Sequence, residues 1–153
     1  GNLPPPSKRG DVFRQAALKA LDTLSRNPDG FFLMIEGSNI DKAAHSNNLE
    51  EMMEELLDFD RTAGAVLDWA AKHPGTLVVI TADHNTGAFA LTGGSREKGE
   101  ITARFGSGSH DGVAVPVYAF GAGSGAFTGI YENTAIFSKI MDAFKKGAGK
   151  PVR

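Results

Sequence analysis

Apolar residues recur along the chain with two different periods, and these periods predict its helices and strands. Apolar residues spaced three or four positions apart predict helices over 11–27, 49–72 and 134–145. Short continuous apolar runs between turn residues predict strands over 31–35, 77–81 and 115–120. A smaller hairpin around Gly93 and Gly94 is predicted from 89–92 and 101–105.

The alternation of helices and strands predicts an α/β fold, with a mostly parallel sheet and helices on both of its faces. Continuous apolar runs such as 31–35 are typical of strands that are covered on both sides. The Pro-rich residues 1–10 predict an extended lead-in, residues 11–146 are expected to form one domain, and residues 147–153 a frayed tail. The length of 153 residues also fits a single domain.

Charge and composition exclude several classes of protein. Lys and Arg number 16 against 18 Asp and Glu, and this net charge of −2 lacks the basic footprint of a nucleic-acid-binding domain. No stretch approaches the ~18 consecutive apolar residues that a membrane-spanning helix needs. The sequence has no cysteine, which excludes disulfides, thiolate zinc ligands and a cysteine nucleophile.

Ionisable residues gather in the loops that border the predicted strands. Six of them come from three loops: Glu36, Asp41 and His45 after the first strand, Asp83 and His84 after the second, and His110 before the third. Ligands of parallel sheets bind beyond the carboxyl ends of the strands. The three loops are therefore expected to meet at one end of the sheet.

Three carboxylates and three imidazoles form a set of metal ligands without sulfur. Imidazole and carboxylate suit zinc, and sites rich in oxygen suit magnesium or manganese. Six ligands exceed the needs of one tetrahedral ion, so the set predicts a site for two or three metals, as used in phosphoryl transfer. Each residue alone also has a structural interpretation; Asp83, for example, could cap the turn after its strand. Their shared location favours the metal site.

Three segments closely resemble the metal-binding segments of alkaline phosphatases, in the same order and spacing. They contain Glu36-Gly37-x-x-Ile40-Asp41-x-x-x-His45, then Thr81-Ala82-Asp83-His84, then Ser109-His110-Asp111-Gly112 followed by Val115-Pro116-Val117-Tyr118. The likeness extends from about Leu3 to Phe144. The chain resembles the C-terminal part of a bacterial alkaline phosphatase.

The resemblance implies a role for each matching residue. Asp41, His45 and His110 would bind one zinc ion, Asp83 and His84 a second, and Glu36 a magnesium ion, while Lys42 would contact phosphate through water. The implied reaction is hydrolysis of phosphate monoesters, in which a serine attacks phosphorus and inorganic phosphate is then released. The resemblance also implies a periplasmic or secreted protein and allows a homodimer.

The nucleophilic serine of alkaline phosphatases belongs to their N-terminal half, and no segment here resembles it. We therefore expect a fragment that carries most of the metal ligands but is inactive by itself. His110 is followed by Asp111, where the family usually has Thr. This extra carboxylate is expected to repel phosphate or to recruit another cation.

Two alternatives stay open on the sequence alone. Other members of the superfamily, such as phosphodiesterases, sulfatases and cofactor-independent phosphoglycerate mutases, share the plan of metal ligands and differ in nucleophile. The second alternative is a non-catalytic fragment that binds metal or phosphate. Lack of the N-terminal half would also expose sheet edges and apolar surface, which favours self-association.

Overall fold

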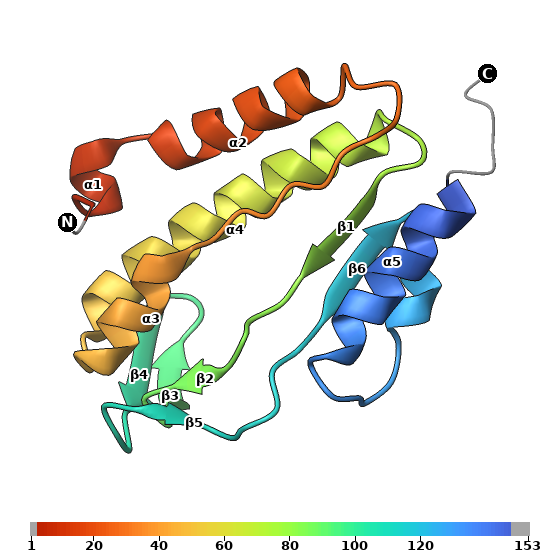
Figure 1. Cartoon of the computed structure of the whole chain (residues 1–153). Helices are drawn as coiled ribbons and strands as arrows, with labels where there is room; N and C mark the ends of the chain where they lie inside the picture. Colours follow the sequence, from red (N-terminus) through yellow and green to blue (C-terminus); the bar gives the residue numbers. More distant parts are fainter. Residues whose placement is uncertain (1–2, 148–153) are drawn as a thin grey trace.

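A computed structural model describes residues 3–147 of the chain (Figure 1). Five helices are present in this part: α1 (Pro6–Arg9), α2 (Val12–Leu24), α3 (Ser38–His45), α4 (Leu49–Ala71) and α5 (Ala135–Gly147). Six strands and one 3₁₀ helix accompany them: β1 (Leu77–Ile80), β2 (Asn85–Thr86), β3 (Ala90–Ser95), β4 (Glu100–Arg104), β5 (His110–Asp111), β6 (Tyr118–Gly121) and η1 (Ser124–Phe127).

The long helix α4 organises the molecule. Helices α2 and α3 pack on it, and the pair β1–β6 lies between α4 and α5 (Figure 1). The short pairs β2–β5 and β3–β4 lie at the end of the molecule near α3 (Figure 1). The structure thus confirms an α/β fold with helices on both faces of a sheet, here the sheet β1–β6.

The prediction of a mostly parallel sheet is wrong for the described residues. Their strands form three separate two-stranded sheets, and all three are antiparallel. In the pair β1–β6, Leu77 lies opposite Gly121 and Ile80 opposite Tyr118. The physical reason is the connection: after β1 the chain passes through β2 to β5 and returns as β6 in the opposite direction (Figure 1), instead of crossing over through a helix.

The predicted strand 31–35 is extended but belongs to no sheet among the described residues. Side-chain exposure alternates along it, with Phe32 and Met34 62% and 75% exposed and their neighbours half-buried. Phe31 contacts the edge of Trp69 in α4, with 6.3 Å between ring centroids. The period of two is that of a strand, so the extended conformation agrees with the prediction. The predicted cover on both sides is wrong, because Phe32 and Met34 are exposed, and so is the predicted sheet pairing.

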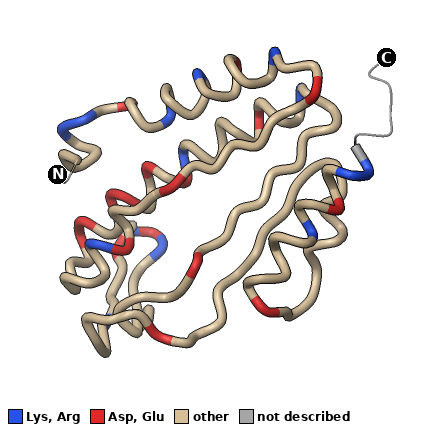
Figure 2. The backbone as a smooth tube through the Cα atoms, in the orientation of Figure 1, with Lys and Arg blue, Asp and Glu red and all other residues tan. Residues whose placement is uncertain are grey.

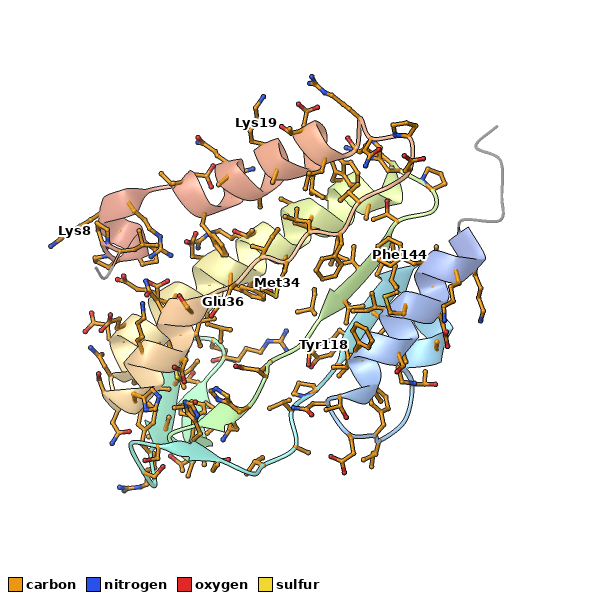
Figure 3. All side chains as sticks on the ribbon, in the orientation of Figure 1. Lys8, Lys19, Met34, Glu36, Tyr118 and Phe144 are labelled. Carbon is orange, nitrogen blue, oxygen red and sulfur yellow. The ribbon has the colours of Figure 1, made fainter. Side chains whose placement is uncertain are left out.

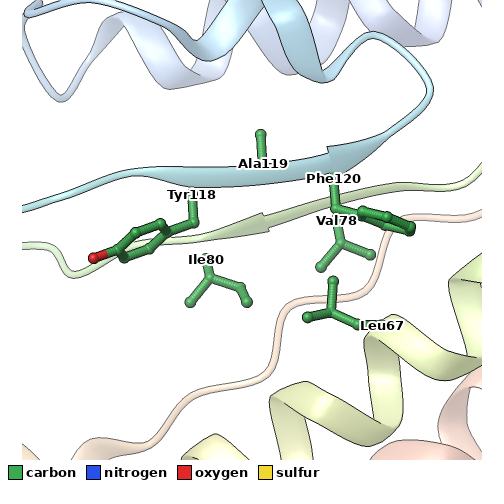
Figure 4. A pocket seen from close by; sticks show the side chains of 6 residues that line it. All are labelled: Leu67, Val78, Ile80, Tyr118, Ala119 and Phe120. Carbon is green, nitrogen blue, oxygen red and sulfur yellow. The ribbon is translucent and has the colours of Figure 1, made fainter.

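An apolar hollow lies between α4 and the sheet β1–β6 (Figure 4). Leu67 of α4 faces Val78 and Ile80 of β1, with Tyr118 and Phe120 of β6 beside them. Tyr118 is 64% exposed. Exposed apolar surface of this kind, next to unpaired strand edges, favours association with other chains.

The Pro-rich start is not simply extended, as predicted, because residues 6–9 form the short helix α1. Pro5 occupies the N-cap and Pro6 the first helical position. Proline suits that position because its ring fixes a helical φ and its missing N–H would have no partner there. The predicted frayed tail lies outside the described residues except for Gly147, the last residue of α5. No helix within residues 3–147 combines the length and apolar character that crossing a membrane requires.

A buried ion network joins α1 to α4. The two guanidinium Nη atoms of Arg9 bond to Glu55 at 2.8 and 2.7 Å, and Nη2 also bonds to Asp58 Oδ2 at 2.7 Å. The three side chains are only 10%, 5% and 4% exposed. Hydrogen bonding to Glu55, followed by that to Asp58, raises the pKa of Arg9 further above its ordinary value. Figure 2 shows the acidic residues of α4 and the basic residues of α1 at the same end of the molecule.

Replacing Arg9 with Ala is expected to lower the free energy of unfolding by about 3–5 kcal/mol, because two buried carboxylates lose their shared cation. Urea unfolding followed by circular dichroism measures this loss. Arg26→Ala is the matched control: Arg26 pairs with Asp22 at 3.1 Å but is 74% exposed, so the loss should be about 1 kcal/mol or less. Equal losses in the two variants would show that burial of the Arg9 network adds no stability beyond that of an exposed ion pair.

Candidate metal centre

Three segments of the chain bring four of the predicted ligands together. Asp41 and His45 lie one turn apart on α3, His84 directly precedes β2, and His110 begins β5. Residues four apart on a helix share one face, so both side chains of α3 point the same way. The predicted loop after 31–35 is therefore largely a helix, and this helix orients two of its ligands.

The side chains of Asp41, His45 and His110 form a small triangle, in which Asp41 faces each histidine with a different carboxylate oxygen. The Nε2 atoms of His45 and His110 are 3.0 Å apart. Asp41 Oδ2 is 3.5 Å from His45 Nε2, and Asp41 Oδ1 is 3.5 Å from His110 Nε2. Ligands about 2.0–2.1 Å from a tetrahedral zinc ion are about 3.3 Å from one another. The triangle thus fits three ligands of one zinc ion.

His84 adds a further donor beside this triangle. Its ring stacks on that of His110 at 3.6 Å between centroids. Asp41, His84 and His110 each offer one ligand atom within 4.8 Å of the other two. His84 Nε2 also lies 3.2 Å from Asp83 Oδ2, a separation that suits adjacent ligands of one ion. His84 therefore brings a further ligand atom to the same cluster.

Hydrogen bonds at the Nδ1 atoms leave the Nε2 atoms of two histidines free to bind metal. His45 Nδ1 lies 2.7 Å from the carbonyl oxygen of Gly108, which can only accept a hydrogen bond. His84 Nδ1 lies 3.2 Å from Thr86 Oγ1, and this hydroxyl donates its own proton to Asp41 Oδ1 at 2.6 Å. Both Nδ1 atoms are therefore donors, and partners of this kind fix the tautomer and orientation of metal-binding histidines.

Thr86 is the residue of this centre that the sequence analysis missed. It is 8% exposed and its hydroxyl contacts both Asp41 and His84. A signal was available: Thr86 lies two residues after His84, and residues two apart in an extended chain point to the same face. A hydroxyl at that spacing could have been expected to support the histidine.

Asp111 has a different role from the expected one. Its carboxylate accepts hydrogen bonds from Asn85 Nδ2 at 3.1 and 2.9 Å, from the Ala88 N–H at 2.9 Å and from the Val113 N–H at 3.1 Å. These bonds, first that of Asn85 and then that of Val113, hold the pKa of Asp111 below its ordinary value. Both oxygens are thus occupied by protein donors, which leaves little reason for this carboxylate to recruit a cation.

Two predicted residues lie apart from the cluster. Glu36 is exposed and precedes α3 (Figure 3). Within residues 3–147 its side chain makes no hydrogen bond or ion pair. Lys42 Nζ donates to Asn39 Oδ1 at 3.1 Å, and Asn39 Nδ2 donates to Glu55 at 3.2 Å. Lys42 is therefore linked to the Arg9 network, while its role toward phosphate stays a prediction.

Gly87 is the point at which the three ligand-bearing segments touch. Its N–H donates to the carbonyl of Ser109 at 2.9 Å, and its carbonyl accepts from the N–H groups of Gly106 and Ser107 at 2.9 and 3.1 Å. Its φ is +82°, and an added Cβ would come within 2.9 Å of Phe105 and 3.2 Å of the Ala44 carbonyl oxygen on α3. Only glycine combines this conformation with such close approach.

Comparisons with known proteins support the resemblance found in the sequence. The model of the alkaline phosphatase family matches residues 8–103. The chain is 45% identical over 85 residues to alkaline phosphatase 4 of Bacillus subtilis, covering 56% of this chain and 18% of that protein. It is 30% identical over 158 residues to the alkaline phosphatase of Escherichia coli, covering 92% of this chain and 34% of that protein.

The fold also matches that of a solved structure. Alkaline phosphatase from the Antarctic bacterium TAB5 superposes with a TM-score of 0.86 at 39% identity, covering 94% of this chain and 44% of that chain. The predicted likeness in fold is thereby confirmed. The matched region is 18% and 34% of the length of the two curated relatives, and less than half of the solved chain.

Gly87→Ala is expected to destabilise the chain by more than Gly30→Ala, which is its matched control. Gly30 has nearly the same φ, +87°, but an added Cβ there meets nothing within 4 Å. The control should lose about 1–2 kcal/mol from the left-handed backbone alone, and Gly87→Ala about 1–3 kcal/mol more from overpacking. Urea unfolding measures both losses, and an equal loss in the two variants would refute the importance of the contact.

Proposed function

Because this chain belongs to the alkaline phosphatase family, we propose that it forms the metal-binding part of a metal-dependent phosphomonoesterase. The observation that carries the proposal is the close approach of the side chains of Asp41, His45 and His110: their ligand atoms come within 3.0 Å between the two histidines and within 3.5 Å between Asp41 and each histidine. Its imidazole and carboxylate donors, without thiolate, suit a catalytic zinc ion. A TAB5 alkaline phosphatase mutant has been solved with Mg bound, which supports a metal cofactor in this family.

We assign the ligands in three groups. Asp41, His45 and His110 bind one zinc ion; Asp83 and His84 bind a second; and Glu36 binds a magnesium ion. The first two groups are supported by donor separations of 3.0–3.5 Å. When bound, such ions offset the charge of a phosphoryl group and lower the pKa of a bound water or hydroxyl.

The chain's own residues prepare these groups for metal. Thr86 holds Asp41 and His84 in place, and the Gly108 carbonyl holds His45. Lys42 reaches phosphate through water after releasing Asn39, because its side chain is exposed and long. The substrates are phosphate monoesters and the product is inorganic phosphate; the intact protein is periplasmic or secreted and forms a homodimer.

The nucleophile belongs to the region of the relatives that this chain does not match. No serine hydroxyl among residues 3–147 hydrogen-bonds to a ligand of the cluster. The nearest in sequence to His110 are Ser107, whose hydroxyl donates to the Ser109 carbonyl at 3.2 Å, and Ser109 itself. The chain in hand is therefore proposed to bind metal without turnover.

Zinc is expected to raise the melting temperature of the chain by about 5–10 °C at 100 times its dissociation constant, since binding to the folded state adds about 2.7 kcal/mol of stability. His110→Ala should reduce this shift, because it removes one of the three ligands of the first zinc ion. His73→Ala is the matched control: His73 stacks on Trp69 at the end of α4 and should leave the shift unchanged. A zinc-independent melting temperature in the parent chain would refute the proposal.

Hydrolysis of p-nitrophenyl phosphate by the zinc-loaded chain tests the proposal that the chain has no phosphatase activity by itself. We expect a rate equal to that of buffer with zinc alone. Zinc-dependent turnover with a covalent phosphoenzyme would show that the chain contains its own nucleophile.

A further inference from the structure

Asp111 lies beside a proposed ligand, His110, yet its carboxylate points to backbone and amide donors. The pair β2–β5 contains only two rungs, Asn85 opposite Asp111 and Thr86 opposite His110. Two rungs alone make a weak connection, because isolated short hairpins are marginally stable. The Asn85–Asp111 bonds therefore add to the backbone bonds of Gly87 in joining the segment that carries His84 to the segment that carries His110.

The same carboxylate also stabilises an unusual backbone conformation. Ala88 has a φ of +43°, in the left-handed region that a residue with a Cβ seldom adopts. Its N–H donates to Asp111 Oδ2 at 2.9 Å. Such conformations persist when their surroundings hold them in place. Asp111 thus fixes the turn 85–88 from both ends, through Asn85 and through Ala88.

The position of this turn determines where His84 stands. His84 precedes Asn85 directly, and its ring stacks on that of His110 at 3.6 Å. His110 in turn precedes Asp111. A single carboxylate therefore ties together the residues that follow both stacked histidines.

We propose that Asp111 is a positioning residue for the metal centre: through Asn85 and Ala88 it clamps the 85–88 turn to β5 and so holds His84 against His110. This inference rests on the proposed function, because it names what orients the ligands of that centre. The alternative for this carboxylate is a charge that attracts cations at short range without any positioning. The two differ in what happens when Asn85 is changed and the charge of Asp111 is kept.

The experiment compares Asp111→Ala and Asn85→Ala with the parent chain of 153 residues. Zinc affinity is measured by competition with a chelator, and the contact between the His84 and His110 rings by nuclear Overhauser effects in the metal-free chain. Asp111→Ala should weaken zinc binding about tenfold, as loss of a partner outside the ligands does elsewhere, and should remove the ring contact. Asn85→Ala should act in the same direction with a smaller effect.

Two further variants sharpen the comparison. Ala88→Gly in the Asp111→Ala background should recover part of the zinc affinity, because glycine adopts positive φ without a Cβ penalty. Asp142→Ala is the matched control for loss of a carboxylate: Asp142 is 66% exposed on α5 and pairs with Lys145 at 3.7 Å. It should change neither zinc affinity nor the ring contact.

The outcomes separate the inference from the proposed function. If Asn85→Ala keeps the parent's zinc affinity and ring contact while Asp111→Ala loses affinity, Asp111 acts as a charge and the clamp is refuted. If Asp111→Ala does not fold, Asn85→Ala decides by the same two measurements. If the parent binds no zinc, the proposed function fails, and the ring contact in the metal-free Asn85→Ala chain still decides whether the clamp exists.

Discussion

The close approach of Gly87 to α3 is the constraint on which the ligand cluster depends. At this point the backbone of the β2 turn lies against the Ala44 carbonyl and the Phe105 ring, with no space for a Cβ. Ala43 and Ala44 are buried there, and small residues of this kind let segments pack closely. Because His45 follows Ala44 directly and His84 lies three residues before Gly87, this one contact sets the distance between the histidines of two segments.

The sheet structure explains why the centre depends so strongly on local clamps. Each sheet in the described part has two strands, and β2 and β5 contribute two residues each. The segment 31–35 and the free edge of β1 offer no further backbone bonds to the ligand-bearing loops. Side chains therefore help to join the ligand-bearing segments. Thr86 connects α3 to the β2 segment, and Asp111 connects that segment to β5.

Two polar systems involve residues near helix α3 and have different environments. The network of Arg9, Glu55 and Asp58 is buried, so it fixes α1 on α4. The cluster of Asp41, His45 and His110 is 38–50% exposed, so its donor atoms remain accessible to an ion and to substrate. Asn39 on α3 donates to Glu55 and accepts from Lys42, which places the ligand-bearing helix directly on the buried network.

The sequence by itself determined what depends on near neighbours. The apolar period of α4 predicted its course to within a residue at its end, and the motifs around Asp41, His84 and His110 predicted the shared cluster and the family. Helix α3 was not predicted because it is short and mostly polar, so no apolar stripe marks it. Tertiary structure decided the antiparallel pairing and the partners of Lys42, Thr86 and Asp111. The physical reason is distance along the chain: Thr86 meets Asp41 across 45 residues and Asp111 meets Asn85 across 26, and such partners are chosen by packing that no local pattern records.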